Sequence, residues 1–386
     1  MKSKFITLKL GIKKNKTDGL LISLSKESIT ELIFTINKFA AAPVIISKHN
    51  ITKSNPKYIF INSGNANACT GKEGLANTKK ILNLLANRLN CNSYEIIIMS
   101  TGIIGRQLPI DDIQESITKN TFNNYSTLKD AATAVMTTDK YPKYLFKQYQ
   151  IGSKKITFSG LCKGAGMIEP NMATMLAFVE TDVSITKSKL KKYLNYCTNL
   201  SFNVISVDGD MSTNDCVAFT STNLVNIDLK NKNNEKKLLE YAVDFFIQLS
   251  SKIVKDGEGA TKIIKLNISN AKTKTLAQVI SRKISNSLLV KTAMYGEDPN
   301  WGRIIASLGS INDSALNVGK VKLFINKILC FENGIPMDAG SKRLARSMKK
   351  NNIEITLDLN SGKSMQTVYF SDLSHEYVHI NSAYTT

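Results

Sequence analysis

The chain has 386 residues, of which 42% are hydrophobic, so it is long enough for two or three packed cores rather than one. It holds no run of roughly 18 apolar residues, as a membrane helix would need, and its first residues lack the apolar stretch of a secretory signal peptide. The formal net charge is +20, but the basic residues are mostly lysines spread along the whole chain, which argues against a nucleic-acid-binding protein. We therefore expect a soluble, cytoplasmic protein with no nucleic-acid or membrane partner.

Short apolar runs bounded by turn residues predict the strands in the first half of the chain. These runs lie at 20–24, 30–35, 58–61, 96–99 and 155–161, and a further one starts at Phe39 and is broken by Pro43. Apolar residues at helical spacing predict a helix around 81–89, and a second helix is expected near 128–136. The strand at 58–61 runs into a turn in which Gly64 and Gly71 permit backbone conformations that other residues avoid.

The second half of the chain continues the alternation of strands and helices. Strands are predicted at 176–179, 203–207, 263–268, 321–324 and 353–358, and helices around 187–197, 235–253, 275–285 and 341–349. No internal repeat is present. The alternation predicts an α/β, or layered α+β, architecture of mixed sheets covered by helices.

Cysteine usage fits a reducing compartment. The six cysteines are scattered along the chain, and none of them forms a Cys-x-x-Cys pair. This pattern favours buried, reduced thiols over a disulfide framework.

The segment KGAGMIEPNMATMLAFVETD, residues 163–182, carries the strongest chemical signal. An Ala-Thr step lies there between a turn rich in Gly, Pro and Asn and an apolar strand. A threonine hydroxyl is a poor nucleophile unless a base lies beside it, and a free α-amine on the same residue is one way to supply that base. If the bond between Ala173 and Thr174 is cut, Thr174 carries both groups at the start of a buried strand.

The segment HEYVH near the end of the chain matches the H-E-x-x-H pattern of zinc proteases. That chemistry needs both imidazoles on one helical face and a third ligand, whereas the segment carries β-forming residues and leaves His49 as the only other histidine. In a strand, His375 and His379 would lie about 13 Å apart, which is too far for one metal. We expect no metal site here.

An acidic turn, DGDMSTND, offers a second alternative site. Asp208, Asp210 and Asp215 suggest a cation, but such turns more commonly cap a helix or hold a loop through hydrogen bonds from side chain to backbone. Gly164 and Gly166 hint at a phosphate loop, yet the rest of a nucleotide-binding motif is absent.

The segment around Thr174 resembles the self-processing segment of the ornithine acetyltransferase family of arginine biosynthesis, also called bifunctional glutamate N-acetyltransferases. Other segments along nearly the full length are similar to the same family, and their combination is specific although no single one is. These segments are GIKK from Gly11, FTINKFAAAPV from Phe34, NSGNANACTG from Asn62, STGIIG from Ser100, AVMTTDKYPK from Ala134, SFNVISVDGDMSTND from Ser201, DGEGATK from Asp256, GEDPNWGRI from Gly296 and the terminal EYVHINSAYTT.

The resemblance implies self-cleavage between Ala173 and Thr174 and an enzyme with an N-terminal nucleophile. The products would be an α chain, 1–173, and a β chain, 174–386, which stay associated in a heterotetramer of two α and two β chains. Within them we expect a nucleophile core at about 1–195, a middle α+β domain at about 196–280 and a C-terminal α+β domain at about 281–386.

By the same resemblance, Thr174 takes the acetyl group of N2-acetylornithine and passes it to glutamate. The Thr101 hydroxyl and the Gly102 amide match the family's oxyanion-hole positions. The substrate-binding positions carried over by motif are Thr137, Lys163, Thr174, Glu258, Asn381 and Thr386. Lys163 suits a substrate carboxylate and Glu258 a substrate amine, and Thr138 is an alternative to Thr137.

Two other functions stay open at this point. An autoprocessed aminopeptidase or amidohydrolase would use water in place of glutamate as the acceptor. A basic nucleic-acid-binding protein would need binding that depends steeply on salt. We expect no cofactor, and the sequence leaves open whether acetyl-CoA also serves as an acetyl donor.

Overall fold

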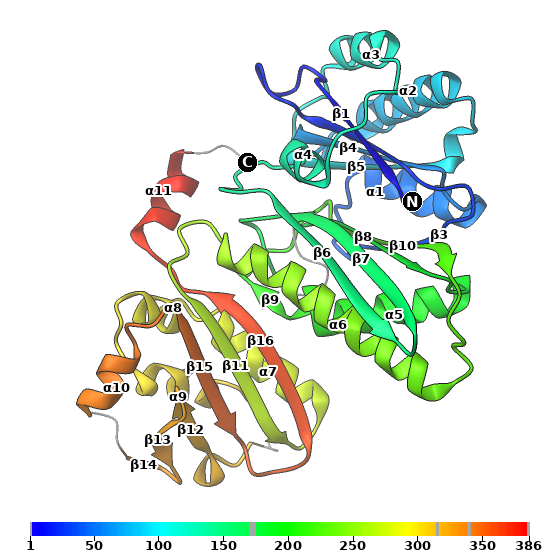
Figure 1. The fold of residues 1–386 in the computed structure, drawn as a ribbon. Coiled ribbons are helices and arrows are strands. Elements are labelled where there is room, and N and C mark those ends of the chain that lie inside the picture. The colour runs from blue at the N-terminus through cyan, green and yellow to red at the C-terminus, as the bar shows by residue number, and fades with distance from the viewer. Residues whose placement is uncertain (1, 170–174, 314–315, 338–340, 384–386) are drawn as a thin grey trace. The chain divides into compact units, whose positions relative to one another are not determined.

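The computed structural model describes residues 2–169, 175–313, 316–337 and 341–383 (Figure 1). These residues form two compact units. Unit 1 comprises Met1–Asn203 and Asp210–Ile253, and unit 2 comprises Val204–Gly209 and Val254–Tyr384.

Unit 1 is built on two mixed sheets. The four-stranded sheet has the order β1-β2-β4-β5, with bounds Lys4–Leu8, Gly19–Ser23, Tyr58–Asn65 and Ile96–Ile103. The five-stranded sheet has the order β3-β10-β8-β7-β6, with bounds Ile29–Phe34, Cys216–Val225, Leu176–Val183, Lys154–Lys163 and Lys143–Ile151. One pair in each sheet is parallel, β4 with β5 and β8 with β10, and the other pairs are antiparallel.

The two sheets of unit 1 share one apolar core. Ile22 and Met99 reach this core from the four-stranded sheet, and Leu161 and Phe178 reach it from the five-stranded sheet. Helices cover the outer faces of both sheets (Figure 1). The helices of unit 1 are α1 (Ala42–Lys53), α2 (Gly71–Leu89), α3 (Ile110–Lys119), α4 (Leu128–Ala134), α5 (Lys187–Leu200) and α6 (Lys232–Lys255), with short 3-10 turns at Ser93–Glu95 and Phe202–Val204. The layered α/β architecture predicted from the sequence is therefore confirmed.

The outer helices are held by apolar side chains. Phe245 and Phe246 of α6 pack against Phe158 of β7 and Phe219 of β10, with ring centroids 5.5 and 5.3 Å apart. On the four-stranded sheet, α2 and α3 bury their apolar stripes against the strands, as the spacing of residues 81–89 predicts for α2. Burial of this kind fixes the strands whose ends carry the candidate site.

Unit 2 contains one mixed seven-stranded sheet. Its order is β14-β13-β12-β15-β11-β16-β9, with bounds Ile335–Pro336, Ile328–Glu332, Lys322–Ile325, Asn352–Asp358, Ile263–Ala271, Ser364–Ser371 and Ile205–Ser206. Its helices are α7 (Lys274–Ser285), α8 (Leu288–Tyr295), α9 (Trp301–Gly309), α10 (Lys342–Ser347) and α11 (His375–Ala383), with a 3-10 turn at Val318–Lys320. Strand β11 pairs with both β15 and β16, so the regions 196–280 and 281–386 contribute to a single sheet.

Three local predictions are wrong. The segment after Phe39 forms helix α1 rather than a strand, because Pro43 lies in the first helical turn, where its missing N–H is not needed. The strand predicted at 203–207 is too long, because a 3-10 turn ends at Val204 and the strand β9 covers only Ile205–Ser206. The HEYVH segment is the start of helix α11 rather than a strand.

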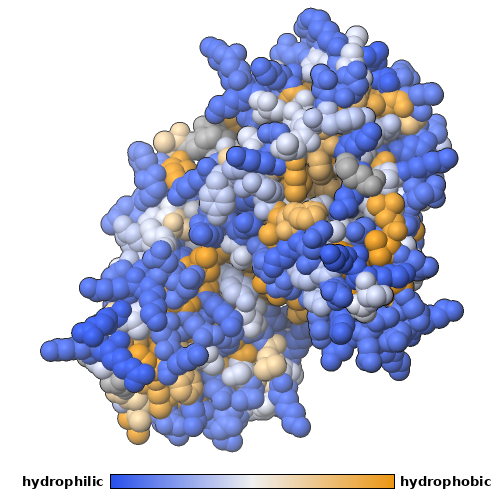
Figure 2. All heavy atoms as spheres, in the orientation of Figure 1, coloured by the Kyte–Doolittle hydropathy of each residue, from blue (hydrophilic) through white to orange (hydrophobic). Residues whose placement is uncertain are grey.

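The face in Figure 2 is mainly hydrophilic, and the cysteines are reduced, as the sequence predicts. Figure 2 shows hydrophilic residues over much of the face in view, with apolar residues gathered in small patches. All six cysteines are free thiols, and four of them are buried. No helix in the described ranges has the length and apolar character that crossing a bilayer requires.

Candidate active site

The predicted oxyanion-hole residues lie near the end of β5, where this strand runs parallel to β4. In that register Thr101 pairs with Ser63, and Gly102 pairs with Gly64. Gly102 has a φ of +131°, and a Cβ at this position would lie 2.2 Å from the carbonyl carbon of Gly64. Only glycine fits such a close approach of two backbones, so packing against β4 fixes the main chain after Thr101.

Polar side chains hold the ends of β4 and β5. Asn62 donates a hydrogen bond to the carbonyl of Asn65 at 2.8 Å, and the Ser100 hydroxyl donates to the side chain of Asn62. Asn214 donates to the carbonyls of Ala66 and Ser100 at 2.7 and 2.8 Å. Asn214 belongs to the acidic turn DGDMSTND, so this part of the turn holds loops by side-chain to backbone bonds.

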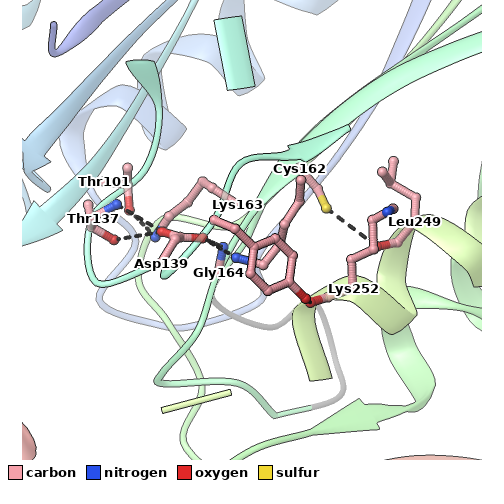
Figure 3. A network of polar contacts seen from close by, with 10 residues as sticks. Thr101, Thr137, Asp139, Cys162, Lys163, Gly164, Leu249 and Lys252 are labelled. Atoms are coloured by element: carbon pink, nitrogen blue, oxygen red, sulfur yellow. Dashed lines mark hydrogen bonds and ion pairs between the residues drawn. The ribbon is translucent and has the colours of Figure 1, made fainter. Parts of the chain in front are cut away.

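Lys163 lies next to Thr101 (Figure 3). Its Nζ donates a hydrogen bond to Thr101 Oγ1 at 3.0 Å, and the residue is only 3% exposed. Lys163 ends β7 and Thr101 lies in β5, so the contact joins the two sheets of unit 1. The sequence placed both residues in the site, and the structure brings them into direct contact.

Asp139 lies at the centre of the polar network in Figure 3. Its carboxylate accepts hydrogen bonds from the amides of Thr137 and Gly164, both at 2.8 Å, and from the Thr137 hydroxyl at 3.5 Å. The ammonium of Lys143 forms an ion pair with it at 2.5 Å, and both of these side chains are almost completely buried. Thr137 therefore joins the same cluster as Lys163 and Thr101.

The charge of Asp139 is stabilised by its neighbours. Burial by itself would raise the pKa of Asp139, but the charges of Lys163 and Lys143 and the hydrogen bond from the Gly164 amide outweigh it. The pKa of Asp139 is therefore held well below its usual range, and the carboxyl group stays ionised.

Lys13, in the GIKK segment, adds a further positive charge. Its Nζ donates a hydrogen bond to the carbonyl of Met136 at 3.0 Å, next to Thr137. Burial lowers the pKa of Lys13, although the Asp18 carboxylate opposes this, and the charge of Lys163 lowers it further. The buried or half-buried Lys13, Lys143 and Lys163 outnumber the Asp18 and Asp139 carboxylates near them, and this surplus of positive charge suits a ligand that carries a carboxylate.

Asp215 lies where β8 begins. Its Oδ1 accepts a hydrogen bond from the amide of Met175 at 2.9 Å, while its Oδ2 has no hydrogen-bond partner among the described residues. Burial raises the pKa of Asp215 well above its usual range, against the opposing effects of the bonds from Met175 and Ser212 and of the Lys163 charge. Burial therefore favours the uncharged form of Asp215, which holds the first described residue after the predicted cleavage point.

Three of the predicted residues lie outside the described part of the chain. These are Ala173 and Thr174, at the predicted cleavage point, and Thr386, at the end of the chain. Two more belong to unit 2, where Asn381 donates a hydrogen bond to Glu258 Oε2 at 2.9 Å. The structure thus brings Glu258 and Asn381 together within unit 2, and Thr101, Thr137 and Lys163 together within unit 1.

The HEYVH segment lies in a helix, so its two histidines are spaced differently from those of a strand. His375 and His379 are one turn apart in α11, so the argument from their separation in a strand does not apply. The ring of His375 packs edge-on against Tyr295, with centroids 5.6 Å apart. Among the described residues, no group of three His, Cys, Asp or Glu side chains is placed to bind a metal.

Sequence reasoning missed two members of the network in unit 1. Asp139 and Lys143 lie in the segment AVMTTDKYPK, in which the motif points only to Thr137 or Thr138. A buried ion pair four residues apart has no signature that separates it from a solvated pair, so the sequence contained no usable signal for it.

Comparisons with known proteins cover almost the whole chain. The model of the ArgJ family matches residues 4–386. The "Arginine biosynthesis bifunctional protein ArgJ" of Lactococcus lactis is 39% identical over 97% of this chain and 94% of its own length. The "Glutamate N-acetyltransferase" of Methanocaldococcus jannaschii is 39% identical over 97% of this chain and 96% of its own length. A crystal structure of ArgJ from Bacillus halodurans matches with a TM-score of 0.51 and 31% identity, covering 54% of this chain and 98% of that chain.

The close approach of β4 and β5 leads to a first prediction. Gly102→Ala should lower the free energy of unfolding by about 2–5 kcal/mol, because a strained positive φ adds to a clash with backbone atoms that cannot move aside. Gly105→Ala is the matched control, since Gly105 also has a positive φ but open space around its Cβ position, and it should cost about 1–2 kcal/mol. Urea denaturation of both variants measures the difference, and equal losses would contradict the role given to the contact with Gly64.

The Asp139 ion pair leads to a second prediction. Asp139→Asn should destabilise the protein by about 3–5 kcal/mol at pH 7, because it leaves Lys143 buried without its counter-charge. Because folding lowers the pKa of Asp139, its contribution is complete above the unfolded value of about 3.9 and is lost as the pH falls below it.

The difference between wild type and Asp139→Asn should therefore shrink as urea denaturation is repeated from pH 7 down to pH 3. Glu27→Gln removes a carboxylate at an exposed position and should change stability by less than about 0.5 kcal/mol at pH 7. A difference that grows toward low pH would show that Asp139 is not held in its ionised form.

Proposed function

The chain belongs to the ArgJ family, and we propose that it carries the acetyl group on Thr174 after cleaving itself at that residue. It is an enzyme of acetyl transfer in arginine biosynthesis, a glutamate N-acetyltransferase. The observation that carries the proposal is the cluster at the end of β5, where the buried Thr101 accepts a hydrogen bond from the buried Lys163 and is followed by Gly102. Such a cluster offers hydrogen-bond donors to an oxyanion in a place that excludes water.

Self-cleavage is proposed as the first reaction. The Thr174 hydroxyl attacks the carbonyl carbon of Ala173, the peptide C–N bond breaks, and the acyl group moves from nitrogen to oxygen. Water then hydrolyses the ester, which leaves the Ala173 carboxylate and a free Thr174 amine. The amine has a reference pKa of about 7.7–8.0, so a useful fraction is neutral and can accept the proton of the hydroxyl on the same residue.

Two observations support this reaction. Asp215 holds the amide of Met175 at 2.9 Å, so the residue next to Thr174 is anchored by a buried side chain. In addition, the solved Bacillus halodurans chain is matched almost completely by about half of this chain, and a fragment spanning 174–386 would have that share of the length.

Acetyl transfer is proposed to follow in two steps. The Thr174 hydroxyl attacks the acetyl carbonyl of N2-acetylornithine, and the α-amine of ornithine leaves with a proton, so that an acetyl ester remains on Thr174. The α-amine of glutamate then attacks this ester, which releases N-acetylglutamate and restores the hydroxyl. Both steps pass through a tetrahedral intermediate whose negative oxygen would bind the Thr101 hydroxyl and the Gly102 amide.

We propose that the remaining polar residues bind the amino-acid substrates. In unit 1 the lysine-rich cluster with Thr137 suits a carboxylate, and the network favours Thr137 over Thr138 because Thr137 makes the bonds to Asp139. In unit 2 the Glu258 carboxylate, held by Asn381, suits an ammonium group. Thr386 is proposed as a further substrate contact from its motif.

Three further features belong to the proposal. The two fragments assemble as two α and two β chains, and the protein acts in the cytoplasm, where its six free thiols stay reduced. Acetyl-CoA is a second acetyl donor, in keeping with the name "bifunctional" carried by the Lactococcus lactis relative. The reaction between amino acids needs no cofactor.

Self-cleavage is tested on a denaturing gel. Purified wild type should run as two fragments, and mass spectrometry should show that the smaller one ends at Ala173. Thr174→Ala should run as one uncleaved band, because it removes the attacking hydroxyl. Thr118→Ala, an exposed position on α3, should cleave like wild type. Cleavage that survives Thr174→Ala would refute the mechanism.

Acetyl transfer is tested with the cleaved enzyme. N2-acetylornithine should yield ornithine and N-acetylglutamate when glutamate is present, and only slow release of acetate when glutamate is absent. Acetate release at full speed without glutamate would instead identify an amidohydrolase. A parallel reaction with acetyl-CoA and glutamate decides whether the enzyme also uses the second donor, since N-acetylglutamate and free CoA should form together.

A further inference from the structure

The contact between Lys163 and Thr101 fixes the direction of one hydroxyl group. A lysine ammonium has three donors and no acceptor, so Thr101 Oγ1 must accept the hydrogen bond that joins the two atoms at 3.0 Å. A threonine hydroxyl has a single hydrogen that rotates to suit its surroundings. With Lys163 on one side of the oxygen, the hydrogen of Thr101 is directed away from it and is free to serve another acceptor.

We propose that Lys163 is a positioning residue of the oxyanion hole, in addition to any contact that it makes with a substrate carboxylate. By occupying the acceptor side of Thr101 Oγ1, it turns the hydroxyl hydrogen toward the oxyanion and makes Thr101 a stronger donor. This inference rests on the proposed function, because it deepens the role given there to Thr101.

The surroundings of Lys163 hold its ammonium in place. The amide of the next residue, Gly164, donates to Asp139 at 2.8 Å, and the charge of Lys163 itself acts on this carboxylate. Lys143 pairs with Asp139, and in the register of β6 and β7 it lies opposite Cys162, the residue before Lys163. The backbone on both sides of Lys163 is thus tied to one buried ion pair.

Hydrogen bonds between charged and neutral groups polarise one another inside a protein. An oxygen that accepts from an ammonium has a more acidic hydrogen, which strengthens its bond to a negative oxygen. The effect is largest in the tetrahedral intermediate, where the charge develops, so it appears in the rate of the chemical step rather than in substrate binding.

A double-mutant cycle tests the inference. Thr101→Ala should lower kcat by about 10²–10³, the usual loss for one oxyanion donor, and Lys163→Met should lower it by a factor of about 10 or more. The kcat of the double variant should lie within about threefold of the kcat of Thr101→Ala, because Lys163 then has no hydroxyl to orient. Thr101→Ser, which keeps the hydroxyl, should stay within about tenfold of wild type.

The cycle is read on kcat per cleaved molecule, with the cleaved fraction measured on a gel. If a variant cleaves too slowly for kcat to be measured, the rate of its self-cleavage is compared in the same cycle. Lys163→Gln replaces Lys163→Met if the latter does not fold, and Lys154→Met, at the exposed start of β7, is the control that should keep the wild-type kcat.

Losses that multiply in the double variant would overturn the inference, as would an effect of Lys163→Met confined to KM, since Lys163 would then act only on the substrate carboxylate. Either result, obtained with an active wild type, would leave the proposed function intact. A wild type that transfers no acetyl group would remove the proposed function and this inference together.

Discussion

The arrangement of the site in unit 1 depends on one buried carboxylate. An isolated aspartate at the depth of Asp139 would be protonated, and a lysine as buried as Lys143 would lose its charge. Together they form an ion pair at 2.5 Å, and the nearby charge of Lys163 stabilises the same carboxylate. Each of these charges offsets the cost of removing the oppositely charged groups from water. Replacing one of them by a neutral residue would therefore remove a counter-charge from a buried charge of opposite sign. Through these charges a buried ion pair fixes the backbone at Thr137 and Gly164, next to the predicted site residue Lys163.

The pKa values of two buried carboxyl groups near the end of β5 are shifted in opposite directions. Lysine charges lower the pKa of Asp139, whereas burial dominates at Asp215 and raises its pKa. The Asp139 carboxylate therefore accepts from a cation and from amides, and the Asp215 side chain accepts from the Met175 amide. Because the charge of Lys163 acts on both groups, the raised pKa of Asp215 lowers its tendency to place a second negative charge near this ammonium.

The sequence predicted the layered fold well, because the apolar residues of α2 recur at helical spacing and strands such as β7 contain short apolar runs. It failed at α1 and α11, where Pro43 and a run of β-forming residues suggested strands, because position in a first turn and tertiary packing override such propensities. Motifs located Thr101 and Lys163 but did not join them, since a contact between two sheets depends on strand registers that the sequence does not display. Asp139 was missed for the same reason: only the folded chain shows that it is buried among lysines.

The two predicted oxyanion donors require different means of support. An amide hydrogen lies in the plane of its peptide group, so fixing the backbone of Gly102 against Gly64 is enough to fix its direction. A hydroxyl hydrogen rotates about the Cβ–Oγ bond, so fixing the backbone of Thr101 leaves its direction open. A group that only donates must therefore occupy the other side of the oxygen. An ammonium meets this need better than an Asn or Gln side chain, which can present its carbonyl oxygen instead, or a second hydroxyl, which can also accept. The contact between Gly102 and Gly64 thus fixes the direction of the amide hydrogen, and the contact between Lys163 and Thr101 fixes the direction of the hydroxyl hydrogen.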